Sequence, residues 1–187
     1  SGHELEQIYA CTERKLVMYT ALCIAVLFNI YKLMALREGA LISQYWHFNG
    51  PELLFETFLN FIFCLAVAYI NLYLVLKKQK VSVKIAIIIL INLILLFAAD
   101  GVGIGVQRRI FLNPTPVQIC RLGYTVRLLA SLLLMAILVQ VLLLLRRQKE
   151  KENENTELRA AYLNAQLELL KEELNPHFFG RSCLQKL

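Results

Sequence analysis

Four long apolar segments alternate with short polar segments as far as residue 145. The apolar segments occupy residues 16–36, 53–76, 83–105 and 122–145. Each is close to the roughly 20 residues that a helix needs to cross the hydrocarbon core of a bilayer. The composition agrees, because 58% of the 187 residues are hydrophobic, whereas soluble globular domains contain about 45–50%. The sequence therefore predicts an all-α protein with four transmembrane helices.

The segment after the fourth apolar run is charged. Residues 146–174 are rich in Glu, Lys, Arg, Gln, Leu and Ala and contain neither Gly nor Pro, a composition that favours a helix. Apolar residues recur at spacings of three and four, at Ala160, Leu163, Leu167, Leu170 and Leu174. This stripe is typical of a coiled coil or a two-helix bundle, although a solvated monomeric stalk is the alternative. We expect this helix to continue directly from the fourth span.

Basic residues are distributed unevenly between the two sides of the predicted spans. One side would carry Arg14, Lys15, Lys77, Lys78, Lys80, Arg146, Arg147, Lys149 and Lys151, and the other Arg37, Arg108, Arg109 and Arg121. Because cytoplasmic loops are enriched in Lys and Arg, we expect both termini in the cytoplasm. This placement accounts for the net charge of +6. No long basic tract is interleaved with aromatic residues, so direct nucleic-acid binding is not expected.

The cysteines give no indication of a metal site. Cys11, Cys23, Cys64, Cys120 and Cys183 are scattered and show no C-x-x-C spacing. Free cysteines are readily buried as small apolar side chains. We therefore expect structural cysteines within or beside the helices, and no metal ligands.

Four ionisable residues fall within the spans or at their edges: Lys32, Glu56, Asp100 and Arg127. With the predicted topology, all four lie toward the outer side. Charges at membrane depth are costly and usually face protein or a water-filled cavity, so two of each sign suggest mutual pairing. The functional interpretation is a polar sensing pocket open to the exterior. The alternative is interfacial snorkelling or a structural salt-bridge network.

Asparagines also occur inside three of the spans. Asn29, Asn60 and Asn92 each lie within an apolar run. Amide side chains in membrane helices commonly hydrogen-bond to a neighbouring helix. We expect such structural bonds from all three.

A histidine follows the charged helix directly, within Asn-Pro-His-Phe at residues 175–178. Pro176 lacks a backbone donor, which predicts that the helix kinks or restarts there. The neutral imidazole of His177 has a free ring nitrogen that can attack an electrophile such as a phosphoryl group. Glu172 or Glu173, four or five residues upstream, could accept the other ring N–H and fix the tautomer.

This arrangement resembles the multi-pass membrane sensor histidine kinases that partner LytTR-type response regulators. Their phosphoacceptor region follows a membrane domain and reads approximately L-x-x-Q-[IL]-N-P-H-F-L-F-N-x-L-N. Residues 169–178 of this chain read Leu-Leu-Lys-Glu-Glu-Leu-Asn-Pro-His-Phe. The resemblance implies that His177 is phosphorylated, that Asn175 and Pro176 shape the turn that presents it, and that Phe178 packs into a dimer bundle.

The chain departs from the family pattern after Phe178. Phe179, Gly180 and Arg181 stand where the family has Leu-Phe-Asn, and no Asn box or Gly-rich lid for nucleotide follows. We therefore expect a truncated sensor kinase in which residues 180–187 derive partly from cloning. Because phosphoryl transfer depends on groups that position ATP and Mg²⁺, this polypeptide alone should not autophosphorylate. ATP and Mg²⁺ are implied only for the full-length parent.

The resemblance implies a division of the chain by function. Residues 1–15 would be a cytoplasmic N-terminal segment, 16–145 a four-span sensor domain, 146–174 a cytoplasmic signalling helix, and 175–187 the start of the phosphoacceptor region. It also implies a homodimer in the lipid bilayer of the bacterial cytoplasmic membrane, with a LytTR-type response regulator as partner of the parent. An envelope or extracellular signal would pass through the coiled coil to His177. The alternative is a non-enzymatic four-span protein that dimerises or recruits a partner through its C-terminal helix.

Overall fold

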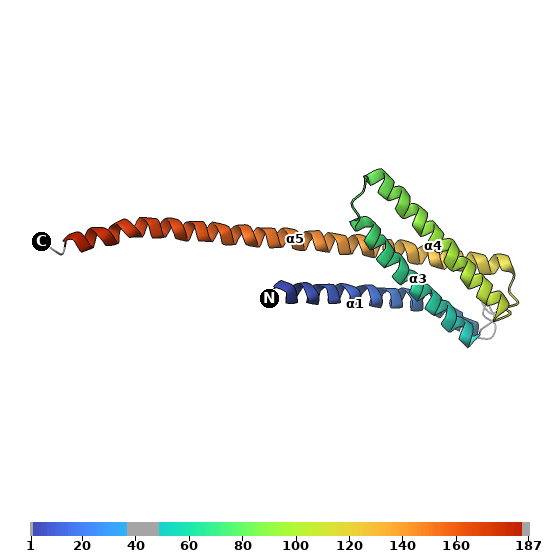
Figure 1. Cartoon of the computed structure of the whole chain (residues 1–187). Helices are drawn as coiled ribbons and strands as arrows, with labels where there is room; N and C mark the ends of the chain where they lie inside the picture. Colours follow the sequence, from blue (N-terminus) through green and yellow to red (C-terminus); the bar gives the residue numbers. More distant parts are fainter. Residues whose placement is uncertain (1, 37–48, 185–187) are drawn as a thin grey trace. The chain divides into compact units, whose positions relative to one another are not determined.

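The computed structural model describes residues 2–36 and 49–184, and these are built from helices. The elements are α1 (Gly2–Asn29), the 3-10 helix η1 (Ile30–Leu36), α3 (Gly50–Leu76), α4 (Val81–Arg109) and α5 (Val117–Leu184) (Figure 1). The structure is 92% helical, and the described residues contain no strand. Among these described residues, four helices are long and apolar enough to cross a membrane. The predicted all-α architecture with four membrane-spanning helices is confirmed, and the chain is a multi-pass membrane protein.

The chain divides into two compact units, Ser1–Leu142 and Leu143–Leu187. The first unit contains α1, η1, α3, α4 and the beginning of α5. Its core combines small side chains with a few large ones, including Ala21, Ala25, Val67, Leu128 and Met135, all of which are at most 2% exposed. Small residues let membrane helices approach closely and gain van der Waals contact.

Two reciprocal hydrogen bonds between side-chain amides join α3 and α4. Asn71 Nδ2 donates to Asn92 Oδ1 at 2.8 Å, and Asn92 Nδ2 donates to Asn71 Oδ1 at 2.7 Å. Lys84 Nζ also donates to the carbonyl of Val75 at 2.8 Å, which closes the short turn between the two helices. The predicted hydrogen bond from Asn92 to a neighbouring helix is therefore confirmed.

Local sequence signals set several helix ends. Pro51 lies in the first turn of α3, where its missing N–H has no intrahelical partner to lose. Glu52 follows in the same turn, where a negative charge is favourable at the positive end of the helix dipole. The connection between α4 and α5 contains Pro114 and Pro116, and neither proline could continue α4.

The largest differences between the predicted and observed boundaries lie at the start of α1 and at Pro176. The helix expected from residue 16 begins at Gly2, because residues 3–15 contain no Gly or Pro to stop a helix propagating outward from the span. The predicted restart at Pro176 is wrong, since α5 runs without interruption to Leu184. A proline removes one backbone donor, and the bonds of the flanking turns suffice to keep the segment helical.

The second unit is the continuation of α5. Its predicted stripe is exposed, with Leu163, Leu167, Leu170 and Leu174 between 53% and 58% accessible in one copy of the chain. The paired coiled coil stays a prediction. Side chains of residues 175–184 are outside the description, as are Arg37 and residues 185–187 altogether.

Candidate functional site: a buried ionic cluster centred on Glu56

The carboxylate of Glu56 accepts hydrogen bonds from three side chains. Its side chain is 1% exposed. Oε2 accepts from Lys32 Nζ of η1, and from Arg127 Nη1 of α5 at 3.2 Å. Oε1 accepts from the hydroxyl of Tyr124, also of α5, at 3.0 Å. One acidic group on α3 therefore joins two other elements of the bundle.

Helical spacing brings the polar residues of α3 to one buried face. Glu52, Glu56, Asn60 and Cys64 follow one another at intervals of four, and all are at most 5% exposed. Residues four apart lie on the same side of a helix, one turn above the next. The buried polar stripe is therefore continuous over more than three turns of α3, and Glu56 and Asn60 within it bind α5.

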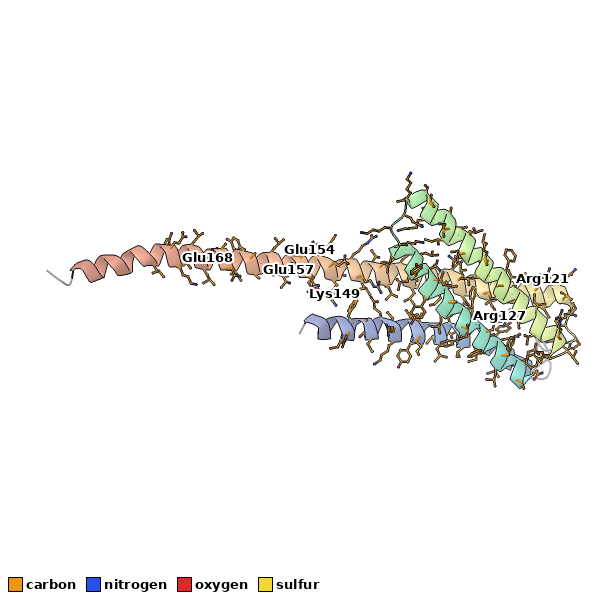
Figure 2. The ribbon with its side chains drawn as sticks, viewed as in Figure 1. Arg121, Arg127, Lys149, Glu154, Glu157 and Glu168 are labelled. Carbon is orange, nitrogen blue, oxygen red and sulfur yellow. The ribbon has the colours of Figure 1, made fainter. Side chains whose placement is uncertain are left out.

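Arg127 binds α1 as well as α3. Its Nη1 donates to Asn29 Oδ1 at 2.7 Å, and its Nε donates to the carbonyl of Gly123 at 3.0 Å. The guanidinium carbon lies 4.8 Å from the centroid of the Tyr124 ring, a favourable position over the negative face of an aromatic ring. Arg127 belongs to the part of α5 that lies in the first unit, and it is labelled in Figure 2. Its Nη2 is buried and has no hydrogen-bond partner among the described residues.

A second set of polar contacts lies one helical turn from Glu56 along α3. Asn60 Oδ1 is 2.9 Å from the hydroxyl of Ser131, which is also 2.8 Å from the carbonyl of Arg127. The thiol of Cys64 is 3.6 Å from the same Asn60 oxygen. The predicted hydrogen bonds of Asn29 and Asn60 between helices are confirmed.

Glu52 binds the connection between α4 and α5. Its Oε1 accepts from Asn113 Nδ2 at 2.8 Å. Asn113 Oδ1 in turn accepts from the backbone N–H of Thr115 at 2.9 Å and from its hydroxyl at 2.6 Å. Arg108 Nη2 donates to the carbonyl of Thr115 at 2.9 Å. These bonds fix the connection against the first turn of α3.

Of the four charges predicted from the sequence, three come together and one does not. Lys32, Glu56 and Arg127 form the cluster, whereas Asp100 Oδ2 accepts a hydrogen bond from Thr125 at 2.7 Å. Within residues 2–36 and 49–184, Asp100 makes no ion pair with Lys32 or Arg127. The expectation that two acidic and two basic residues pair with one another is wrong for Asp100, because both cations bind the same oxygen of Glu56.

Several members of the polar network were not predicted from the sequence, among them Glu52, Tyr124 and Asn113. Glu52 fell in the predicted loop before the second span, although its position four residues before Glu56 would have indicated a shared helix face. Tyr124 and Asn113 carry no local signal, because tyrosine is common in apolar runs and asparagine is common in turns. Their roles follow only from the packing of α3 against α5.

A small cavity adjoins the cluster. Its volume is about 10 Å³, which corresponds to roughly one water molecule. It is lined by Asn29, Glu56, Leu59, Asn60, Tyr124, Arg127 and Leu128. Ligand pockets for small organic molecules usually measure about 300–1,000 Å³. The cavity described here is therefore far too small for a metabolite, and the cluster connects the helices through polar contacts.

The structure places His177 within α5 and leaves its side-chain geometry undescribed. The backbone of residues 175–178 is helical, and Glu172 and Glu173 are exposed on the preceding turn. Whether either carboxylate reaches the imidazole therefore stays a prediction. In the part of the chain with described residues, no group of three His, Cys, Asp or Glu side chains is arranged to hold a metal ion.

Comparison of the chain with protein-family models, with curated proteins and with solved structures finds no match.

Proposed function

We propose that this chain is the membrane input portion of a sensor histidine kinase of the family that partners LytTR-type response regulators. It passes an envelope or extracellular signal to the phosphoacceptor His177. One observation carries the proposal. The helix that contributes Arg127 and Tyr124 to the buried cluster is the same uninterrupted helix that contains the Asn-Pro-His-Phe segment.

The cluster offers a physical route from a signal to this helix. Glu56 of α3 holds Arg127 and Tyr124 of α5 and Lys32 of η1. A signal that favours a second packing of these helices must replace or rearrange those bonds. The signal shifts the equilibrium between the two packings only by the difference between its binding free energies for them. The resulting displacement of α5 is the output of the membrane domain.

The leucine stripe of α5 supports a dimeric output. Apolar residues at alternating spacings of three and four form the seam of a left-handed coiled coil. In the proposed homodimer, the stripe of one copy packs against the stripe of the other, and movement of α5 changes access to His177. The ATP-binding domain of the full-length parent supplies the nucleotide and Mg²⁺. For His177 to meet ATP, the C-terminal end of the chain must lie in the cytoplasm. The distribution of basic residues predicts that both chain ends lie there.

The test is phosphorylation of the full-length gene product in membranes, with γ-labelled ATP and Mg²⁺. We expect label that is stable to alkali and labile to acid, as a phosphohistidine is, and we expect His177→Gln to remove it. His3→Gln is the matched control and should retain the label. Label that persists in His177→Gln would exclude this histidine as the acceptor.

The exposed stripe also supports a second candidate function, a non-enzymatic four-span protein that dimerises or recruits a partner through α5. This candidate predicts no labelling of the wild-type protein under the same conditions. It also predicts that His177→Gln leaves association through α5 unchanged.

A further inference from the structure

We propose that the cavity beside Arg127 is a hydration site, in which one water molecule completes the buried ionic cluster. The proposal goes beyond the signalling function and does not depend on it. It would hold equally if His177 were not phosphorylated.

Size restricts what the cavity can hold. Its volume is about 10 Å³, and a water molecule needs about 10–15 Å³ measured in the same way. Most of the cavity wall is apolar, formed by Leu59, Leu128 and the hydrocarbon parts of the other side chains, although five of the seven lining residues also carry a polar group. A purely apolar cavity stays dry, so a water molecule here depends on the polar groups that can bond to it.

An unsatisfied donor indicates where the water binds. Arg127 lines the cavity, its side chain is 8% exposed, and its Nη2 is buried without a hydrogen-bond partner among the described residues. Leaving a buried charged donor unpaired costs more free energy than leaving a neutral donor unpaired. A water oxygen that accepts from Nη2 removes this cost.

The same cavity supplies acceptors for the two water hydrogens. Glu56 Oε1 accepts one bond from Tyr124 and retains capacity for another. The amide oxygens of Asn29 and Asn60 also belong to lining residues. Buried waters typically make about three hydrogen bonds, and one donor with these acceptors provides that number. An anion would have to lie beside the Glu56 carboxylate, which makes a neutral molecule the better occupant.

The experiment is solid-state NMR of the full chain, labelled with ¹⁵N-arginine, in lipid bilayers. Magnetisation is transferred from water to the guanidinium nitrogens, and the Arg127 resonances are assigned by their loss in Arg127→Lys. We expect transfer to Arg127 Nη2 at short mixing times. Its absence from the wild-type spectrum would overturn the proposal.

A cavity-filling variant tests the location of the water. Leu59 is half-buried at the cavity wall, so Leu59→Phe should displace the water and abolish transfer to Nη2. Leu54→Phe is the matched control on the same helix, because Leu54 is 73% exposed, and it should leave transfer unchanged. Transfer that persists in Leu59→Phe, with the Arg127 resonances in place, would show that the water lies elsewhere and would refute the site.

A structure at a resolution that shows ordered water provides a measurement without any variant. Density is expected within hydrogen-bond distance, about 3 Å, of Arg127 Nη2. A well-ordered Arg127 without such density would contradict the proposal even if Leu59→Phe failed to fold.

Discussion

At the scale of single residues, two buried glutamates on the same face of α3 have different partners. Glu56 binds the cations Lys32 and Arg127, whereas Glu52 accepts from the neutral amide of Asn113. A buried ion pair can contribute little net stability, but removing one partner leaves the other charge uncompensated. The two glutamates should therefore respond differently to loss of charge, although their side chains and burial are similar.

We predict that Glu56→Gln lowers the free energy of unfolding by about 3–5 kcal/mol, because Lys32 and Arg127 both lose the negative charge of this carboxylate. Glu52→Gln is the matched control. Its amide oxygen can still accept from Asn113, so the expected loss is at most about 1 kcal/mol. The measurement is reversible unfolding in mixed micelles with a rising fraction of denaturing detergent. Equal effects of the two substitutions would show that charge pairing at Glu56 does not stabilise the fold.

Individual residues also show how much of the site could be predicted from the sequence. Lys32, Glu56 and Arg127 were identified because a charge inside an apolar run is conspicuous. Asp100 was identified for the same reason, but the sequence does not specify partners, and the structure pairs it with Thr125. Tyr124 and Asn113 were missed, since their importance arises from contacts between residues far apart in the chain.

At the scale of helices, a glycine allows α4 and α5 to approach closely. A Cβ atom on Gly103 would lie 2.5 Å from Cε1 and 2.9 Å from Cδ1 of Tyr124. The Tyr124 ring is 2% exposed and its hydroxyl is bonded to Glu56, so it has little freedom to move away. Gly101 and Gly105, on the same helix, would meet nothing within 4 Å. Only the middle glycine of the three is required by packing.

We predict that Gly103→Ala destabilises the protein by about 1–3 kcal/mol through overpacking against Tyr124. Gly101→Ala and Gly105→Ala should be neutral or stabilising by up to about 1 kcal/mol, because alanine is the better helix former. The same micelle unfolding assay compares all three variants. If Gly103→Ala behaved like its neighbours, the close approach of α4 to Tyr124 would be refuted.

Helices were predicted more accurately than their ends and their contacts. The four spans follow from apolar length, which a bilayer imposes directly on sequence. The start of α1 at Gly2 and the continuation of α5 through Pro176 did not follow, because helices propagate beyond apolar runs and tolerate a single lost bond. The contact between Gly103 and Tyr124 depends on how α4 and α5 are each rotated about their own axes. Hydrophobicity alone does not specify this rotation when lipid surrounds the bundle.

At the scale of the whole molecule, the second unit leaves an apolar stripe uncovered. Leu163, Leu167, Leu170 and Leu174 are all more than half exposed, on a segment that also carries Glu154, Glu157 and Glu168 (Figure 2). Charged residues keep the segment soluble, but they do not bury the leucines. In the proposed function, a second copy of the same helix covers the stripe in register, because parallel coiled coils align identical seam positions.

We therefore predict that Leu167→Cys forms a disulfide-linked dimer in membranes under mild oxidation, whereas Glu168→Cys does not. Cysteines replace adjacent residues, one on the seam and one on the outer face, so helix content and distance from the membrane are matched. Cys11, Cys23 and Cys183 are replaced by serine in both variants, and the buried Cys64 and Cys120 are kept. In a parallel pair, seam residues of the two copies face each other, whereas outer positions are separated by both helices. Equal cross-linking at the two positions would indicate random collision, and its absence from both would favour the monomeric stalk.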